Sequence, residues 1–151
     1  MYMHQTEIGM TTKTEKKPTA CYCLKARRAT ASVTKHYDQA LAPCGITINQ
    51  FSVLMNISRA ERCSVRELAD MAELDKSTLA RNLKPLYRMG LVVDSKEPGM
   101  RNSQLELTKA GRKTIECAAP LWAEAQQVLA DKLGKDGLRA LELVTGVLGE
   151  W

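Results

Sequence analysis

The densest group of side chains suited to chemistry lies between residues 76 and 88. This segment holds four cations and no carboxylate: Lys76, Arg81, Lys84 and Arg88. At helical spacing, three of these cations share one face with Ser77. Exposed helices usually mix both signs of charge, because Glu–Lys pairs four residues apart stabilise them. A helix without such pairs suits a phosphate-rich surface such as DNA, and the alternative is a solvated basic face.

The side chains of this segment have distinct expected roles on double-stranded DNA. We expect Arg81 to contact a base edge, since one Arg can bond both O6 and N7 of guanine. Short polar side chains at the start of the helix also suit base edges, whereas lysines suit phosphates. The predicted DNA contacts are Arg66, Lys76, Ser77, Thr78, Arg81, Asn82, Lys84 and Arg101.

Two short helices with a tight joint are predicted to position these side chains. Ser64 and Glu67 form a capping box at the start of the first helix. Asp75 is a good N-cap for the second, because its carboxylate accepts hydrogen bonds from free N–H groups. The second helix should pack through one apolar face, formed by Leu79, Leu83, Leu86 and Gly90. Pro85 lies inside this helix and is expected to kink it or to end its regular part.

A β-hairpin is predicted directly after the second helix. Its flanks are Leu-Val-Val-Asp-Ser after Gly90, which is rich in β-branched residues, and the alternating segment Ser-Gln-Leu-Glu-Leu-Thr. Pro98-Gly99 marks the turn, and Arg101 lies near the tip. Helix, turn, helix and hairpin together predict a winged helix-turn-helix.

These segments resemble the MarR family of bacterial transcription regulators. The motifs that carry the resemblance are Ser-Val-Arg-Glu-Leu-Ala, Asp-Lys-Ser-Thr-Leu-Ala-Arg-Asn-Leu, Met-Gly-Leu-Val, and Arg101 followed by Leu-Glu-Leu-Thr-Lys-Ala-Gly. With its flanking helices, the resemblance covers residues 20–150. It implies a homodimeric repressor that binds a pseudo-palindromic operator. A small phenolic or similar effector, entering between the helical cap and the winged domain, would then release the DNA.

Two positions depart from the pattern of that family. The joint between the two helices often contains Gly in the family, and this chain has Glu73. Family members usually have Asp two residues before the wing Arg, where it can steady that side chain, and this chain has Gly99. Arg101 is therefore expected to be held less firmly than the wing Arg of the family.

The segments around the winged helix-turn-helix are predicted to be mainly helical. Residues 1–18 are polar and are interpreted as a flexible tail. A long helix is expected over 19–41, with an apolar stripe that runs from Tyr22 to Leu41. Thr47 and Gln50 form a second capping box, which opens a shorter helix.

After the wing, a long helix is expected from Thr108 to about Leu133. Pro120 is expected to interrupt and kink it, and Gly134 to end it before a last helix begins. The apolar side chains of these helices exceed what a small winged core can cover. The resemblance favours a dimer in which they interleave, and the alternative is a helical cap packed within one chain.

The predicted fold class is mainly α with a small β-wing. We expect a single domain over 19–151, with the winged helix-turn-helix at about 46–108. Dimerisation helices are expected at about 19–42 and 109–151. Residues 114–151 carry three Lys or Arg against six Asp or Glu, so this end is acidic although the net charge is +5. That asymmetry fits separate surfaces for DNA and for self-association.

Composition bounds the remaining classes of protein. No apolar run approaches the ~18 residues of a membrane span, and the first twenty residues lack a signal-peptide core, so a cytoplasmic protein without membrane contact is expected. The five cysteines show no paired CxxC spacing, which argues against a structural zinc site or a disulfide scaffold. No constellation of residues predicts an enzyme, a cofactor or a resident metal.

Cys21 and Cys23, at the start of the first predicted helix, raise the question of a metal sensor. Zinc would need both thiols together with His36 or Cys44. Residues two apart on a helix point about 200° apart, so both thiols can reach one ion only where the helix frays. This geometry argues against a zinc site.

The alternative function is thiol-based redox sensing through Cys23. The hydroperoxide-responsive branch of the family has a reactive Cys near the start of this helix and a Tyr fourteen residues later, which Cys23 and Tyr37 match. The branch also has a Tyr one turn after the Cys, where this chain has Arg27. We expect burial to raise the thiol pKa more than the helix end lowers it, which leaves Cys23 inert. If Cys23 does react, Cys117 is the first candidate for a resolving thiol.

Three classes of function are therefore weighed. The first is a DNA-binding regulator with a small-molecule effector, the second a thiol-based redox protein, and the third a protein–protein adaptor. The uninterrupted basic face of residues 76–88 argues against the adaptor. The candidate residues for an effector pocket or sensor are Cys23, Arg28, Tyr37 and Trp122.

Overall fold

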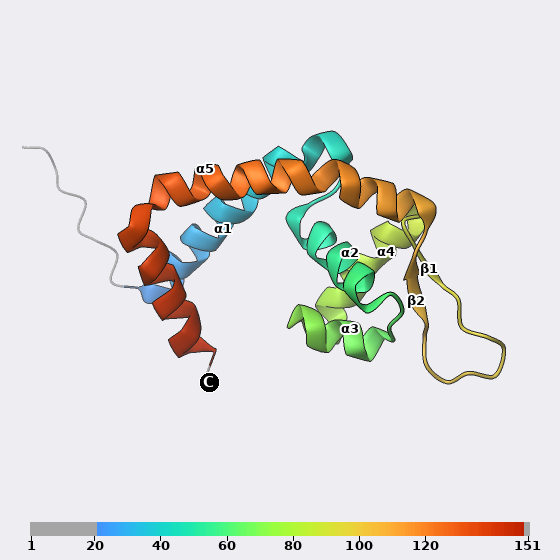
Figure 1. Cartoon of the computed structure of the whole chain (residues 1–151). Coiled ribbons are helices and arrows are strands. Elements are labelled where there is room, and N and C mark those ends of the chain that lie inside the picture. Colours follow the sequence, from blue (N-terminus) through green and yellow to red (C-terminus); the bar gives the residue numbers. More distant parts are fainter. Residues whose placement is uncertain (1–20, 150–151) are drawn as a thin grey trace, which may run out of the picture.

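The computed structural model describes residues 21–149, which form five α-helices, one short 3-10 helix and a two-stranded sheet. In chain order these elements are α1 (Tyr22–Leu41), η1 (Ala42–Cys44), α2 (Ile48–Ala60), α3 (Val65–Ala72), α4 (Lys76–Arg88), β1 (Val92–Asp94), β2 (Leu105–Leu107) and α5 (Lys109–Leu148). Figure 1 shows α5 running across the whole molecule, with α1 beside it at one end and the compact winged domain below its other end. The mainly helical fold with a small wing is the predicted one.

The helix starts lie where the capping residues predicted them. Thr47 and Ser64 each open a helix through a complete capping box, with Gln50 and Glu67 respectively. The Asp75 side chain caps α4, and the Thr108 side chain caps α5. Each cap satisfies N–H groups that the first helical turn cannot pair internally, so a local sequence signal was sufficient.

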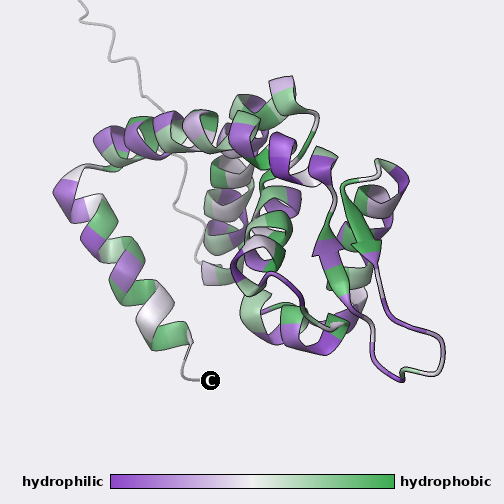
Figure 2. Cartoon of the chain, turned by 45° about the vertical axis from the view of Figure 1, so that its right-hand side comes forward, coloured by the Kyte–Doolittle hydropathy of each residue, from purple (hydrophilic) through white to green (hydrophobic). Residues whose placement is uncertain are grey.

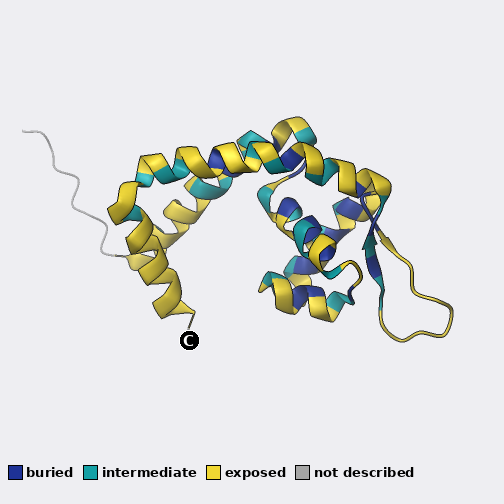
Figure 3. Ribbon diagram, viewed as in Figure 1, coloured by how far each residue is buried: buried dark blue, intermediate teal, exposed yellow. Residues whose placement is uncertain are grey.

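One hydrophobic core holds the winged domain together. Its largest fully buried side chains come from α1, α2, α3, α4 and β2: Leu41, Val53, Leu54, Ile57, Leu68, Leu79, Leu86 and Leu105. Figure 3 shows that burial is concentrated in this domain, whereas the far end of α5 is almost entirely exposed. The core therefore fixes α3, α4 and the wing relative to one another.

Neither proline inside a helix ends it, so the predicted interruption at Pro120 was wrong. α4 continues through Pro85 to Arg88, and α5 keeps helical backbone angles through Pro120. Each Pro deprives the carbonyl four residues earlier of its partner, but those carbonyls belong to the exposed residues Arg81 and Glu116, where water can replace the N–H. Packing of the neighbouring leucines on the core then keeps α4 intact.

The break in α5 lies at Gly134, as predicted, although the helix is otherwise continuous from Lys109 to Leu148. Gly134 has φ 64° and ψ −179°, a backbone conformation that residues with a Cβ rarely adopt. The chain turns sharply there, and Figure 2 shows the last segment folding away from the long part of α5 with a green apolar side. Several large apolar side chains of this segment are exposed: Leu138, Leu141, Leu143, Val144, Val147 and Leu148.

The start of α1 departs from the predicted apolar stripe. Only Tyr37 and Leu41 are buried in this helix, and Tyr22 exposes 82% of its surface. Later in α1, His36 Nε2 lies 2.8 Å from the carbonyl oxygen of Ala125, and the Tyr37 hydroxyl donates to the Gln126 side chain. α1 is therefore attached to α5 through its second half.

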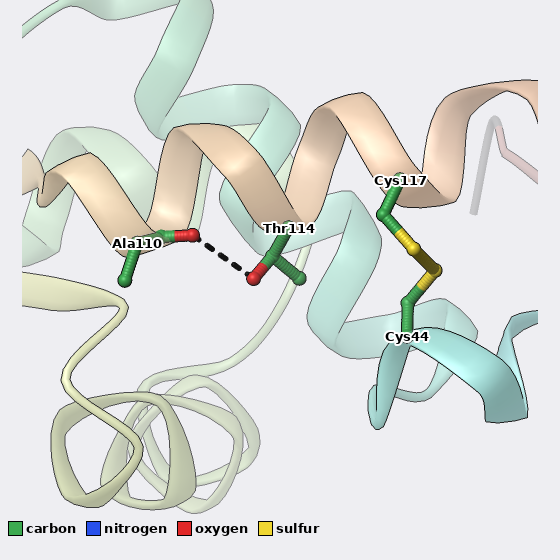
Figure 4. Close-up of a disulfide and its surroundings, with 4 residues drawn as sticks. All are labelled: Cys44, Ala110, Thr114 and Cys117. Atoms are coloured by element: carbon green, nitrogen blue, oxygen red, sulfur yellow. Dashed lines mark hydrogen bonds between the residues drawn. A yellow bond between two sulfur atoms is a disulfide. The ribbon is translucent and has the colours of Figure 1, made fainter.

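A disulfide between Cys44 and Cys117 was not predicted. It joins η1 to α5 across 73 residues of sequence, with the two Cα atoms 6.2 Å apart (Figure 4). The expectation against a disulfide scaffold did not anticipate this single bond, because the fold brings together two residues whose spacing in the sequence carries no signal. The same bond removes Cys117 as a resolving thiol for Cys23.

Within residues 21–149, no single helix is long and apolar enough to cross a membrane, and one bent pair, Tyr22–Cys44 with Ile48–Ala60, passes that test only by combined length and composition. The predicted tail at residues 1–18 lies outside the described residues.

Candidate nucleic-acid interface

α4 presents the predicted basic face to the outside. Leu79, Leu83 and Leu86 are buried on one side of the helix. The cations Arg81, Lys84 and Arg88, together with Ser77, are exposed on the other, and Lys76 is exposed at the first turn. Arg66 is also exposed, on the neighbouring helix α3. The structure thus brings the predicted residues of α3 and α4 onto adjoining helices.

The joint between α3 and α4 is a left-handed turn at Glu73. Glu73 has φ 52° and ψ 39°, and its N–H caps the carbonyls of Ala69 and Asp70. Gly adopts this conformation without strain, which explains the frequent Gly at this joint, whereas here Glu adopts it at a cost of the order of 1 kcal/mol. Glu73 therefore adopts the left-handed conformation in which Gly is favoured.

The first turn of α4 is organised around Asp75. Its Oδ1 accepts from the Thr78 backbone N–H at 2.9 Å and from the Ser77 hydroxyl at 2.5 Å. Its Oδ2 accepts from the Thr78 hydroxyl at 2.6 Å. The hydrogen bonds from Ser77 and Thr78 hold the pKa of the Asp75 carboxyl well below its usual value, so the group stays ionised.

Two further predicted residues are held by bonds within α4. Arg81 Nη2 lies 3.3 Å from the Thr78 hydroxyl oxygen, to which it donates. Asn82 Nδ2 donates to the backbone carbonyl of Thr78 at 3.0 Å, and its side chain is half-buried. Arg81 therefore extends along the exposed face, whereas Asn82 folds back onto its own helix.

The wing is a β-hairpin whose loop is exposed. β1 and β2 are antiparallel, with Val92 opposite Leu107 and Asp94 opposite Leu105. Arg101 lies in the exposed loop between them, two residues after Gly99, which has φ 93°. Figure 1 shows this loop and α3 extending to the same side of the molecule, away from α5.

The base of the wing is tied together by side chains that sequence reasoning missed. Asp94 Oδ1 accepts from the backbone N–H groups of Lys96 at 3.2 Å and Gln104 at 2.8 Å. The Glu106 carboxylate accepts from the Ser95 hydroxyl and pairs with Arg62, and these bonds lower its pKa. The wing is therefore braced at its base, where no local sequence motif marks the pairing.

Ser103 connects the wing directly to α3. Its hydroxyl oxygen accepts from the backbone N–H of Val65 at 2.8 Å, one of the N–H groups that the first turn of α3 leaves unpaired. A side chain of the wing thus completes the cap of a helix in the helix-turn-helix, and the two parts are positioned as a unit.

An apolar cavity of about 490 Å³ lies between α2 and α5. Trp122 lines it, and the ring centroids of Trp122 and Phe51 are 6.1 Å apart. Arg59 contributes a cation to the lining, and the other lining residues are Ile48, Asn49, Ser52, Met55, Asn56, Ala119 and Ala123. Of the predicted pocket residues, only Trp122 lies here.

The remaining predicted pocket or sensor residues lie away from this cavity, on α1. Cys23 and Arg28 are exposed, and Tyr37 is buried against α5. Fourteen residues of helix separate Cys23 from Tyr37, about 21 Å at 1.5 Å per residue, so one chain does not bring them together. The expected burial of Cys23 was wrong, because this end of α1 lies beyond the part packed on α5. Burial does raise the pKa of another thiol, that of Cys63.

No group of three His, Cys, Asp or Glu side chains in the part of the chain that the structure describes is arranged to hold a metal ion. The fold and the exposed basic face together define a winged helix-turn-helix protein.

Comparisons with known proteins identify its family. The MarR family profile matches residues 46–101. The DNA complex of the transcriptional regulator MosR from M. tuberculosis is 34% identical, with a TM-score of 0.73 over 86% of this chain and 96% of that one. The chain belongs to the MarR family.

Two further relatives extend the comparison. The regulator SarZ of Staphylococcus epidermidis is 32% identical over 53% of this chain, and the match spans 55% of the length of SarZ. The chain thus spans about half the length of the curated relatives it matches. The transcriptional repressor CouR, bound to p-coumaroyl-CoA, is 26% identical, with a TM-score of 0.74 over 85% of this chain and 91% of that one.

Proposed function

We propose that this protein is a transcription regulator that binds double-stranded DNA in a sequence-specific manner. The observation that carries the proposal is the exposed surface of α4, where four cations and no carboxylate lie between Lys76 and Arg88. In a winged helix-turn-helix, such a helix fits the major groove, and the wing with Arg101 fits the adjacent minor groove. The DNA complex of the relative MosR supports the same reading.

We further propose that it acts as a homodimer on a pseudo-palindromic operator. The exposed apolar side chains after Gly134 leave a face that a second copy could cover, since contiguous exposed apolar patches mark interaction surfaces. A two-fold dimer would place two α4 helices about 34–36 Å apart, one turn of DNA. We also propose that residues 19–151 form a single domain.

Selection of bound sequences from a random DNA pool tests the proposal directly. We expect a two-fold symmetric consensus and a complex of two chains per duplex. The double variant Arg81→Ala, Lys84→Ala should lose binding, while Lys135→Ala, which removes an exposed cation near the bend of α5, should retain it. Absence of any enriched sequence, or equal loss in the control, would contradict the proposal.

The cavity between α2 and α5 is the proposed effector site, with a small aromatic or phenolic acid as ligand. Phe51 and Trp122 supply aromatic surface, and Arg59 supplies a positive charge for a carboxylate. The ligand of the relative CouR, p-coumaroyl-CoA, carries a phenolic group and supports this class of ligand. Because both α2 and α5 line the cavity, ligand entry can alter the position of the winged domain relative to α5. We propose that the protein is a repressor and that this change releases the operator DNA.

The effector proposal is tested with salicylate and p-coumarate in a Trp151→Phe background, which leaves Trp122 as the single tryptophan. Binding should quench Trp122 fluorescence and release operator DNA. Arg59→Ala should weaken the binding of these two carboxylates more than the binding of phenol itself, which is neutral. Lys113→Ala, which removes an exposed cation elsewhere on α5, should change the binding of neither the carboxylates nor phenol. Quenching that Arg59→Ala leaves unaltered would contradict this site.

Thiol-based redox sensing is the second candidate, and the exposure of Cys23 favours it. A hydroperoxide would oxidise the Cys23 thiolate to a sulfenic acid and be reduced to the alcohol. The test is operator binding by wild type and Cys23→Ser, each with and without stoichiometric cumene hydroperoxide. Loss of binding in oxidised wild type alone would support this candidate, and unchanged binding in both proteins would remove it.

A further inference from the structure

The hydroxyl groups of Ser77 and Thr78, at the start of α4, donate their protons in fixed directions. A hydroxyl has one proton to donate and two lone pairs that accept. The Ser77 hydroxyl donates its proton to Asp75 Oδ1 at 2.5 Å, and the Thr78 hydroxyl donates to Oδ2 at 2.6 Å. Since the Asp75 carboxylate is an acceptor only, neither of these bonds can run in the opposite direction. Ser77 is exposed, so what it offers to a partner is a lone pair.

Because the Ser77 hydroxyl offers a lone pair, it can bind only to hydrogen-bond donors on DNA. Phosphate oxygens are acceptors, so Ser77 could contact one only by withdrawing its proton from Asp75. That step would break a charge-assisted hydrogen bond and bring a phosphate towards a carboxylate. In the major groove the only hydrogen-bond donors on base edges are the exocyclic amino groups of adenine (N6) and cytosine (N4).

We propose that Ser77 is a specificity-determining residue that accepts a hydrogen bond from the exocyclic amino group of an adenine or a cytosine in each half-site. This inference rests on the proposed DNA binding and adds to it the chemical class of the base that is read. It differs from the general expectation for a serine at a protein–DNA interface, which can donate to a phosphate as readily as it accepts from a base.

Thr78 has a different role, because its proton and one of its two lone pairs are already used within α4 and its side chain is half-buried. It donates to Asp75 and accepts from Arg81 Nη2 at 3.3 Å. Thr78 is therefore a positioning residue, which links the guanidinium of Arg81 to the fixed carboxylate. Arg81 keeps its remaining donors for the O6 and N7 acceptors of guanine.

The spacing of Ser77 and Arg81 relates the two bases that they read. They are one turn apart on the same face of α4, about 6 Å along the helix axis. Base pairs are stacked at about 3.4 Å, so the two contacts should lie within about two base pairs of each other. The half-site is then expected to pair a guanine with a nearby adenine or cytosine.

The test removes one amino group at a time from the duplex selected by the wild-type protein. Adenine is replaced by 2-aminopurine, which still pairs with thymine but has no amino group in the major groove, and cytosine by N4-methylcytosine, whose methyl group replaces the outward N–H. Binding of the full chain is measured for wild type and for Ser77→Ala. The Thr114→Ala variant, which removes a hydroxyl that donates to the Ala110 carbonyl within α5 (Figure 4), is the control.

We expect one position per half-site at which the modified base weakens DNA binding by wild type and by Thr114→Ala about 2- to 12-fold, the usual effect of one hydrogen bond. At that position Ser77→Ala should bind modified and natural duplexes equally. Asp75→Asn should reduce this discrimination, because an amide can donate to Ser77, which occupies one lone pair and frees the proton to donate to other groups. The Asp75 cap of Thr78 is retained in Ser77→Ala, so its fold is preserved.

Two results would overturn the inference. One is a Ser77→Ala variant that weakens every sequence alike and stays as sensitive to the modified bases as wild type, which would indicate a phosphate contact. The other is a wild-type protein that tolerates all the modified bases. In both cases DNA binding itself remains intact, whereas failure of the wild type to bind any selected duplex would instead refute the proposed function.

Discussion

Gly111 of α5 lies directly against the backbone carbonyl of Leu91, where the chain leaves α4 for the wing. A Cβ placed on Gly111 would approach the Leu91 carbonyl oxygen to less than 3.0 Å and the carbonyl carbon to 3.1 Å. The same oxygen accepts from the Thr108 N–H at 3.1 Å, so it cannot move away freely. The first turn of α5 can therefore rest on the base of the wing only because residue 111 has no side chain.

Gly111→Ala is expected to destabilise the protein by about 1–3 kcal/mol, the usual effect of forcing a group into packed structure. Gly146→Ala is the matched control, since nothing lies within 4 Å of its added Cβ and Ala favours a helix by up to about 1 kcal/mol. Urea unfolding at one protein concentration measures both. Equal stability of the two variants would contradict the close approach at Leu91.

DNA binding is expected to depend steeply on salt. If each subunit of the proposed dimer neutralises about four phosphates, the slope of log K against log salt concentration should be about −7, from ~0.9 per phosphate. Fluorescence anisotropy of a labelled operator at several salt concentrations gives the slope. A flat response, or a single monomer bound to an isolated half-site, would argue against a dimer with an extended basic interface.

Substitution of Arg81 and substitution of Arg101 should change DNA binding in different ways, because Arg81 lies on α4 and Arg101 on the wing loop. Arg81→Ala is expected to cost about 1–3 kcal/mol per half-site and to relax the preference at one base. Arg101→Ala should weaken all sequences together or affect A·T-rich flanks. Competition with single-base operator variants separates the two patterns, and an exchange of patterns would mean that the groove assignments are wrong.

Local signals in the sequence predicted the elements well. Ser64, Thr47, Asp75 and Thr108 each open a helix where expected, because a cap is a contact between residues three apart. The alternation of apolar and polar residues around Leu105 predicted β2, because alternate residues of a strand face the same side. The basic face of α4 was predicted because helical periodicity determines which residues share a side.

Features that depend on tertiary structure were missed. Whether Pro120 breaks a helix depends on what lies around it, and here α5 continues. The pairing of Arg62 with Glu106 and the cap from Ser103 to Val65 join residues that are far apart in sequence. No residue pattern within one element records such contacts.

The Cys44–Cys117 disulfide should contribute to stability chiefly by restricting the unfolded chain. For a closed loop of 73 residues, the chain-entropy estimate is about 4 kcal/mol. Treatment with dithiothreitol should therefore lower the midpoint of urea unfolding in wild type and have no effect on Cys44→Ser. A Cys63→Ser variant, which keeps the pair, should respond as wild type does, and an unchanged midpoint in wild type would show that the bond does not form in solution.

The pH dependence of stability should reveal the Asp75 cap. Hydrogen bonds from Ser77 and Thr78 lower the pKa of this carboxyl in the folded state, while in the unfolded chain it is about 3.9. A group with a lowered pKa contributes stability that is fully present above its unfolded pKa and is lost as the pH falls towards the folded pKa. Asp75→Asn has no such group, so its free energy of unfolding should lack that part of the pH dependence.

The stability difference between wild type and Asp75→Asn should be constant above about pH 5 and should shrink as the pH falls below about 4. Urea unfolding at pH 7, 4 and 3, at fixed protein concentration, measures this difference. Asp136→Asn, which removes one charge from the exposed segment after Gly134, controls for the change in net charge. A difference that stays constant down to pH 3, or that also appears with Asp136→Asn, would show that the hydrogen bonds to Asp75 do not stabilise α4.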